Sequence, residues 1–470
     1  MFRINIITPF FIKTIENRKI VKIFKKFVYG LLKYNSAIIK IQVTPYVKEE
    51  GMNQKWLKVT EIFDEYERRF CAARADKELL YPWKDCDRSK IIESVKRMIG
   101  YDESYVPNIR CMDEILQTEY EGYSAIQYRF ESWEKVYGSA TLYLPDKKEK
   151  MPLVFVCCGH GKMGRLTSSY MAMGHRLASL GMAALVIDNI GQGDRCRVGY
   201  GRHDPDHWTA VAPFNCGLTL QGLIVMETIG LIRHMAKDVR FDSTRLGACG
   251  NSGGGTLTMF LAALAPELSV IASSGYPAEI FYIMQKEREH CACNLFVGQA
   301  YEAEMWEIYS TFAPKPLLLS GGVHDNLFPQ DLVHRNARKV KNTYVQMDAA
   351  DSFGFELTDT KHSWEISDVN LISGFLSKRL LGVDAKDSSE LFETDDVADF
   401  QVPLPQNSLA TAELSEMLTG IKSSDDIKLS DVFVPTYKGK PIDPDIIQTD
   451  VGRGDVMRVF AQFECALAEK

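Results

Sequence analysis

Ser252 stands at the centre of Gly250-Asn-Ser-Gly-Gly254, a G-x-S-x-G pattern. The residues before it are apolar enough for a buried strand, and residues 256–264 have the spacing of a buried helix. Between a strand and a helix, this pattern is typical of a nucleophile turn that strains the serine backbone and lifts its hydroxyl above the sheet. The two outer glycines are needed because a Cβ at either position would collide across the turn. An idle serine is the alternative, since a chain with 33 glycines can contain the pattern by chance.

A serine hydroxyl becomes a nucleophile when a base lies within hydrogen-bond distance and an acid orients that base. Asp325 follows the apolar run 316–320, and His362 lies in a later loop, just ahead of a helical pattern. The order serine, acid, histidine is the order of the hydrolase arrangement. The sequence therefore predicts a catalytic triad of Ser252, Asp325 and His362.

Other residues compete for two of these roles. Asp325 alone would also fit a turn or a helix cap, and Glu279 is the alternative acid. His324 adjoins the predicted acid and His334 falls within a predicted helix, which disfavours both as the base.

An ester or amide carbonyl also needs backbone N–H groups that stabilise its developing negative charge. Gly253, the residue after the nucleophile, is expected to supply one of them. The loop after the apolar run 153–158 is rich in glycine, and its Gly161 or Lys162 is expected to supply the other.

The elements that must position these residues alternate along the chain from residue 152. A hairpin over residues 122–132 and 137–144 precedes them. Continuous apolar strands alternating with helices predict an α/β fold with a mostly parallel sheet covered on both faces, and ligands bind such sheets at the carboxyl ends of the strands. The predicted strands are 153–158, 183–187, 246–249, 268–273, 316–320 and 342–347, and the predicted helices are 170–180, 218–235, 256–264 and 364–381.

The chain is expected to have four regions. Residues 1–51 are interpreted as a non-native or disordered leader, because Lys48-Glu-Glu-Gly-Met52 can be encoded by a purine-rich ribosome-binding site followed by a start codon. A basic, membrane-surface helix is the alternative for this region. Residues 52–121 are a helical lead-in with helices at 56–80 and 91–99, and residues 122–382 are the catalytic domain. Residues 383–470 are an acidic linker and a small module of open role, with a helix at 410–418 and strands at 431–434 and 456–461.

Composition narrows the range of partners. The net charge of −7 and the pI of about 5.8 argue against nucleic acid. The apolar runs are too short to span a membrane, no secretion signal is evident, and the 11 cysteines lack disulfide-like spacing, which together favour the cytoplasm. No cofactor is expected, because the glycine loops lack the nucleotide-binding patterns. No metal site is expected either, because His290, Cys291 and Cys293 lack a convincing second pair of ligands. A homo-oligomer is compatible with the sequence.

Five segments resemble successive loops of the α/β-hydrolases, and within that superfamily the chain most resembles the bacterial acetyl xylan esterase-like and dienelactone hydrolase-like branch. The resemblance covers residues 123–381. The segments are Cys158-Gly-His-Gly, Val186-Ile-Asp-Asn-Ile-Gly-Gln-Gly-Asp194, Gly250-Asn-Ser-Gly-Gly254, Gly321-Gly-Val-His-Asp325 and Lys361-His362.

The resemblance implies hydrolysis of short acyl esters, often acetyl groups on sugars. We therefore predict a serine carboxylic-ester hydrolase that takes a small-molecule ester, such as an acetylated sugar or oligosaccharide. A peptidase or a thioesterase would use the same triad. From another class of protein, a non-catalytic hydrolase-fold scaffold whose tail binds a partner is the remaining alternative.

Overall fold

The structure is a computed structural model of the 470-residue chain, which divides into two compact units, residues 1–55 and 56–470. All the residues that it describes belong to the second unit, so the predicted leader lies outside them. The described residues are 57–58, 85–161, 163–196, 213, 216–280, 282, 294, 296, 302–392, 397–422, 436–437, 440–441 and 447–448.

A nine-stranded sheet organises the described residues, with the strand order β10-β9-β8-β7-β5-β6-β4-β3-β2. The six strands from β10 to β6 run parallel, and β4, β3 and β2 continue the sheet antiparallel. The strands are β2 (Cys111–Tyr120), β3 (Tyr123–Glu131), β4 (Tyr137–Pro145), β5 (Met151–Cys157), β6 (Ala183–Ile187), β7 (Phe241–Asn251), β8 (Val270–Ser274), β9 (Leu317–Gly322) and β10 (Phe353–Thr358).

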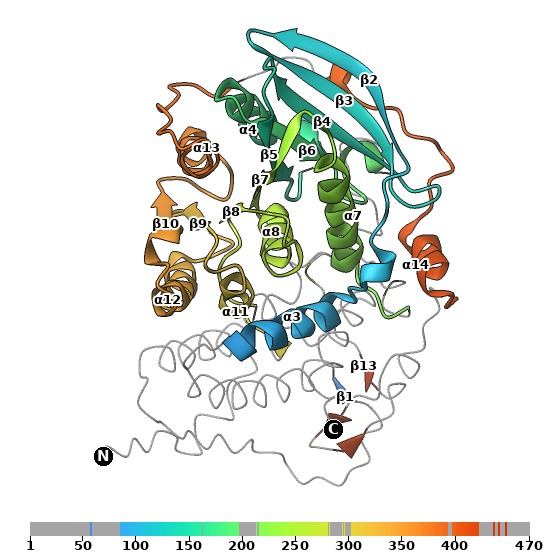
Figure 1. The fold of residues 1–470 in the computed structure, drawn as a ribbon. Helices are drawn as coiled ribbons and strands as arrows, with labels where there is room; N and C mark the ends of the chain where they lie inside the picture. Colours follow the sequence, from blue (N-terminus) through green and yellow to red (C-terminus); the bar gives the residue numbers. More distant parts are fainter. Residues whose placement is uncertain are drawn as a thin grey trace, which may run out of the picture. The chain divides into compact units, whose positions relative to one another are not determined.

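Helices cover both faces of this sheet (Figure 1). On one face, α4 (Ser168–Ser179) and α13 (Ile366–Leu380) share an apolar cluster with the strands. The other face carries the larger cluster, in which α7 and α8 pack directly against the strands. The helices of that face are α3 (Asp85–Ile99), α7 (Leu220–Met235), α8 (Gly253–Leu264), α11 (Met305–Ser310) and α12 (Gln330–Gln346). Two covered faces explain why β5 and β6 are buried along their whole lengths.

Strand β5 lies between β6 and β7, so the order in which strands are added to the sheet reverses at β5. The chain passes from β5 through α4 to β6 on one side, and from β6 through α7 to β7 on the other. Such a switch point opens a crevice at the carboxyl ends of the neighbouring strands. Ser252 follows β7 at this edge, beside the loop that follows β5.

Most of the predicted elements of the sheet are confirmed, but the predicted strand 342–347 is wrong. Those residues form the end of α12, and the strand that leads to His362 is β10. The apolar residues of this segment continue a helical spacing, with Ala337, Val340 and Tyr344 buried on one side of α12. A six-residue window hides this longer period.

The segment before the catalytic domain is only partly helical where the structure describes it. Helix α3 confirms the helix predicted at 91–99 and extends it to Asp85. Strand β2 lies where the lead-in was expected to be helical, and it pairs antiparallel with β3 at the edge of the sheet. Its mostly exposed side chains lack the apolar alternation that reveals a strand. Of the helix predicted at 56–80, only Leu57–Lys58 is described, as strand β1, which pairs parallel with β13 (Ile447–Gln448).

The tail packs on the catalytic domain well beyond residue 382. Helix α14 (Thr411–Thr419) confirms the helix predicted at 410–418, and its Leu414 is buried in the larger apolar cluster. The N–H of Leu409 donates to the carbonyl of Lys135 at 2.8 Å. The strands predicted at 431–434 and 456–461 lie outside the described residues. Within the described part of the chain, no helix is long and apolar enough to cross a membrane.

Candidate active site

Ser252 occupies the turn between β7 and α8, with φ 58° and ψ −119°. A positive φ is costly for a residue with a side chain, so the surrounding structure must hold it in place. Part of that restraint is the Ser252 N–H, which donates to the carbonyl of Ser274 on β8 at 3.1 Å. The strained turn expected of a G-x-S-x-G nucleophile is therefore present.

The glycines around Ser252 are required by close backbone contacts. A Cβ at Gly254 would lie 1.9 Å from the carbonyl oxygen of Cys157, and one at Gly250 would lie 2.3 Å from the carbonyl oxygen of Gly254. Both contacts are far below van der Waals distance. The contact at Gly250 confirms the predicted collision across the turn, whereas the contact at Gly254 is with the neighbouring strand β5. A Cβ at Gly253 would instead meet the imidazole of His160 at 2.8 Å.

The structure brings Ser252, His362 and Asp325 together in one hydrogen-bonded chain. His362 Nε2 lies 2.8 Å from Ser252 Oγ, and His362 Nδ1 lies 2.7 Å from Asp325 Oδ2. An ionised carboxylate only accepts hydrogen bonds, so Nδ1 carries the proton and Nε2 is left to accept the serine hydroxyl proton. The three residues come from loops at the carboxyl ends of β7, β9 and β10, which meet at one edge of the sheet, with β8 between β7 and β9.

Asp325 is fixed at both carboxylate oxygens. Its Oδ1 accepts the N–H groups of Leu327 and Phe328 at 2.8 and 3.0 Å, which leaves Oδ2 for the histidine. The carboxylate is 2% exposed, so water competes little for these bonds. The alternative acid, Glu279, pairs with Arg335 at 2.7 Å. Of the other histidines, His324 bonds the exposed Asp359 at 2.8 Å and His334 lies in α12.

Of the residues predicted to donate to the oxyanion, Gly253 fits the role and Gly161 does not. Gly253 is the first residue of α8, where an N–H has no acceptor within the helix and the helix dipole favours negative charge. The Gly161 N–H already donates to the carbonyl of Gly159 at 2.9 Å, so it is engaged within its own loop and does not fit the expected role. Lys162 lies outside the described residues.

A buried arginine that the sequence analysis missed holds the neighbouring loops. Arg165 is fully buried and follows β5, and its guanidinium bonds Asp188 at 2.9 Å and Asp194 at 2.6 Å in the loop after β6. It also donates to the carbonyl of Phe400 in the tail at 2.6 Å. Burial raises the pKa of Asp194 to about 6, although Arg165 opposes that shift. Sequence alone gave no signal for Arg165, because its partners are far away along the chain.

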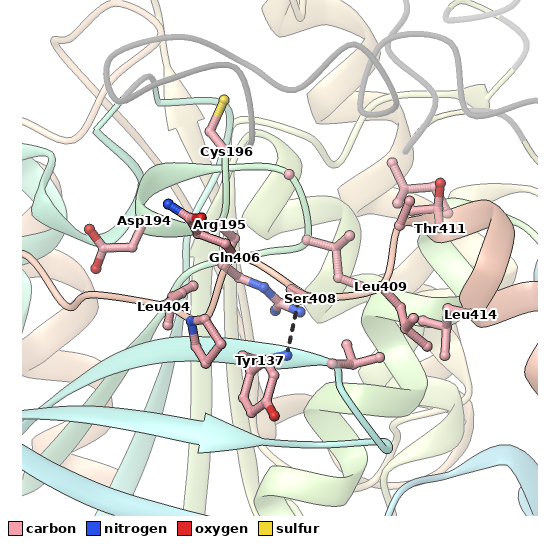
Figure 2. Close-up of a pocket in the computed structure, with 16 residues that line it drawn as sticks. Tyr137, Asp194, Arg195, Cys196, Leu404, Gln406, Ser408, Leu409, Thr411 and Leu414 are labelled. Atoms are coloured by element: carbon pink, nitrogen blue, oxygen red, sulfur yellow. Dashed lines mark hydrogen bonds between the residues drawn. The ribbon is translucent and has the colours of Figure 1, made fainter.

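A pocket of about 440 Å³ lies where the tail crosses the loop after β6 (Figure 2). The start of β4 and residues 190–196 form one side, and residues 404–414 form the other. Figure 2 shows the bond from the Tyr137 N–H to Ser408 Oγ, 3.4 Å long, across this pocket. Its buried charges are matched within the protein, since Arg195 bonds Glu227 and Asp194 bonds Arg165. The tail is therefore part of the wall of a cavity in the catalytic domain.

Six cysteines are free thiols: Cys111, Cys157, Cys158, Cys196, Cys216 and Cys249. Burial raises the pKa of Cys157 to about 12, and it raises the pKa values of Cys158 and Cys249 well above the ordinary range. These thiols are therefore protonated packing groups at neutral pH. In the described ranges, no cluster of three or more His, Cys, Asp or Glu residues could hold a metal ion. The segment with His290, Cys291 and Cys293 lies outside those ranges.

Comparisons with known proteins agree with this architecture. Residues 112–282 match the model of the acetyl xylan esterase family. A curated relative, "Putative hydrolase YtaP" of Bacillus subtilis (strain 168), is 26% identical over 179 residues, which cover 38% of this chain and 58% of that protein. The chain thus spans less than two thirds of this relative. The solved structure of "Methylesterase BT1017" has a TM-score of 0.55 at 18% identity, covering 76% of this chain and 74% of its own. This protein therefore has the α/β-hydrolase fold, and its residues 112–282 match the acetyl xylan esterase family.

Proposed function

We propose that the protein is a serine carboxylic-ester hydrolase. The observation that carries this proposal is the hydrogen-bonded chain from Ser252 Oγ through His362 to Asp325, with distances of 2.8 and 2.7 Å. The match of residues 112–282 to the acetyl xylan esterase family supports the same reaction class. Three residues from three separate loops meet in the order and geometry that acyl transfer requires.

In the first half of the reaction, Ser252 Oγ bonds to the ester carbonyl carbon while His362 Nε2 takes its proton. Asp325 stabilises the imidazolium that forms. The carbonyl oxygen becomes an oxyanion, and the free N–H of Gly253 at the start of α8 stabilises that charge. As the tetrahedral intermediate collapses, the bond between carbonyl carbon and alcohol oxygen breaks, and His362 returns the proton to the departing alcohol.

In the second half, water attacks the acyl-enzyme. His362 removes a proton from the water, a second tetrahedral intermediate forms, and the bond to Ser252 Oγ breaks. The carboxylic acid leaves and Ser252 regains its proton. The protein's own residues supply every proton transfer in this cycle.

The proposed substrates are short acyl esters, with acetyl groups on sugars or oligosaccharides as the first choice. The family match supports this choice, since the family is described as acetyl xylan esterase. The proposed location is the cytoplasm, which the six free thiols support, because oxidising compartments favour disulfides.

The test is hydrolysis of p-nitrophenyl acetate, butyrate and octanoate by the full chain and by its Ser252→Ala variant. We expect turnover that is fastest with acetate and that falls by a factor of about 10⁴ to 10⁶ in the variant. Acetylated xylo-oligosaccharides and methyl-esterified uronic acids then separate an acetyl esterase from a methyl esterase.

A matched control is Ser269→Ala, which removes a half-buried hydroxyl just before β8 that bonds the carbonyl of Leu246 on β7 and should keep normal turnover. Turnover that survives Ser252→Ala would contradict the proposal. Cleavage of peptides or thioesters in preference to every oxygen ester would move the protein to the peptidase or thioesterase class. A folded wild-type protein without any Ser252-dependent hydrolysis would favour a scaffold.

A further inference from the structure

Trp364 lies two residues after His362, in the loop between β10 and α13, and it is 3% exposed. Its indole N–H donates to the hydroxyl of Ser274 at the end of β8, with an Nε1 to Oγ distance of 2.6 Å. A buried indole N–H needs such an acceptor, but a backbone carbonyl would serve equally well for packing alone. Here the acceptor is a side chain that itself contacts the nucleophile turn.

Ser274 connects to that turn through both its side chain and its backbone. An indole N–H only donates, so Ser274 Oγ accepts from Trp364. The acceptors in reach of its own proton are Asn251 Oδ1 at 3.0 Å and the Gly250 carbonyl at 3.4 Å, both in the nucleophile turn. Asn251 directly precedes the nucleophile. The carbonyl of Ser274 accepts the N–H of Ser252 at 3.1 Å. One residue of β8 thus holds the strained serine and receives the bond from the histidine loop.

The same indole is linked through Tyr170 to the loop that follows β5. The ring of Tyr170 on α4 packs edge-on against Trp364, with centroids 5.5 Å apart and an interplanar angle of 75°. The Tyr170 hydroxyl accepts the N–H of Gly159 at 2.6 Å. A Cβ at Gly159 would lie 3.0 Å from Ser252 Cβ, so this loop touches the nucleophile itself. Tyr170, Trp364, Ser274 and Asn251 are all buried, which protects these contacts from water.

We propose that Trp364 is a positioning residue, which acts through Ser274 and Asn251 to hold the histidine loop in register with the nucleophile turn. The inference rests on the proposed function, because it concerns the geometry of that same site. A side chain that only filled space at position 364 would be replaceable by another large aromatic ring. A side chain that positions His362 through its N–H would not be.

The decisive variant is Trp364→Phe, which keeps an aromatic ring beside Tyr170 and removes the N–H. The matched control is Trp133→Phe. Trp133 is also a buried tryptophan, and it lies in the turn between β3 and β4. Its indole N–H donates to the carbonyl of Tyr105 at 2.8 Å. Both variants lose one buried indole hydrogen bond. We expect Trp364→Phe to lower kcat for p-nitrophenyl acetate roughly tenfold or more with little change in KM, since small misplacements of reacting groups reduce the rate strongly. Trp133→Phe should leave both constants within about twofold.

A double-mutant cycle with Ser274→Ala tests the route of the effect. If Trp364 acts through Ser274, the double variant Trp364→Phe/Ser274→Ala loses little more activity than the more damaging single variant. Multiplicative losses of kcat would place the two residues in independent roles and overturn the proposed chain. Equal kcat losses in Trp364→Phe and Trp133→Phe would also overturn it, because general destabilisation would then explain both.

Labelling with a fluorophosphonate separates this inference from the proposed function. Ser252 Oγ bonds to the phosphorus and fluoride leaves, so the labelling rate reports the activation of the serine without any ester substrate. Slower labelling of Trp364→Phe than of Trp133→Phe supports the positioning role. If the wild type is labelled and the two variants are labelled at equal rates, the positioning role is contradicted and the proposed function is not. A wild-type protein that is neither labelled at Ser252 nor active on esters contradicts the proposed function itself.

Discussion

Gly253 and Gly254 follow the nucleophile directly, yet a methyl group at each would meet a different kind of neighbour. At Gly254 it would lie 1.9 Å from the carbonyl oxygen of Cys157, which is part of the backbone of β5. At Gly253 it would lie 2.8 Å from the His160 imidazole, which is a side chain and not backbone. Glycine at position 254 is therefore required by the fold, whereas glycine at position 253 is required by the active site.

We predict that Gly254→Ala lowers the free energy of unfolding by about 3 kcal/mol or more, because neither backbone can yield without moving a central strand. Gly253→Ala should cost about 1 kcal/mol and lower kcat about tenfold to a hundredfold, since the methyl group crowds the proposed oxyanion donor. Urea unfolding and p-nitrophenyl acetate turnover measure the two effects separately. Equal stability losses in both variants would contradict this division.

Helix α4 carries His175 on its buried side, in contact with three tyrosines and with the chain that follows α13. Its Nδ1 lies 2.9 Å from the Tyr123 hydroxyl, and Phe392 stacks on its ring with centroids 3.4 Å apart. Tyr120 and Tyr143 complete the contacts at 4.8 and 4.6 Å between centroids. Burial lowers the pKa of His175 to about 3, so this imidazole stays neutral in the folded protein at moderately acidic pH.

This neutral histidine should make the fold sensitive to acid. Below the ordinary histidine pKa of about 6.5, the unfolded chain binds a proton that the folded chain refuses until the pH is near 3, so stability falls as pH falls through this window. We expect a contribution of about 1.4 kcal/mol per pH unit that is missing in His175→Gln. The measurement is the free energy of unfolding of both proteins between pH 7 and pH 4.5.

The result is the difference in free energy of unfolding between the wild type and His175→Gln at each pH. The difference is needed because Asp194 contributes a pH dependence of stability with the opposite sign. Its pKa is raised to about 6 by burial, so the folded protein holds that proton more tightly, and the associated stability is lost as pH rises through 6. Asp194 is unchanged in the variant and cancels in the difference. Parallel curves for the wild type and His175→Gln would show that His175 does not carry the acid sensitivity.

Across the whole molecule, the tail behaves as a part of the catalytic domain where it is described. Phe400 gives its carbonyl to the buried Arg165, and the N–H of Val402 donates to Asp194 at 3.0 Å. Helix α14 adds the side chain of Leu414, 1% exposed, to the main core. A segment with these contacts cannot detach without leaving a buried guanidinium and a buried carboxylate short of partners.

We therefore predict that Leu414→Ala destabilises the catalytic domain itself, by about 2 to 5 kcal/mol. Its control on the same helix is Met417→Ala, whose side chain is 42% exposed and whose loss should cost less than about 0.5 kcal/mol. Unfolding followed through p-nitrophenyl acetate turnover and through circular dichroism measures both variants. If the midpoint at which activity is lost is unchanged in Leu414→Ala, the tail is an independent module.

The sequence by itself determined the elements whose signals are local. A glycine turn between an apolar strand and an apolar helix marks Ser252, and the loops after later strands mark Asp325 and His362, because parallel strands bring their carboxyl ends to one edge. The alternation of strands and helices predicted a parallel sheet covered on both faces, whereas the resemblance of five loop segments implied the α/β-hydrolase fold, and the comparisons confirm both. Strand β2 could not be predicted because its exposed side chains have no apolar alternation. The strand predicted at 342–347 is wrong because the end of α12 resembles a strand in a short window.

Only the tertiary structure decided which distant residues support the site. Arg165 meets Phe400 across 235 positions of the chain, and Trp364 meets Ser274 across 90. A hydrogen bond depends on where two groups lie in space, and these pairs, unlike the triad, have no motif that marks them along the chain. The same limit applies to Leu414, whose packing in the main core has no local sequence signal. Local patterns specify strands, turns and helices, whereas burial and long-range pairing arise only when the whole sheet and its helices have assembled.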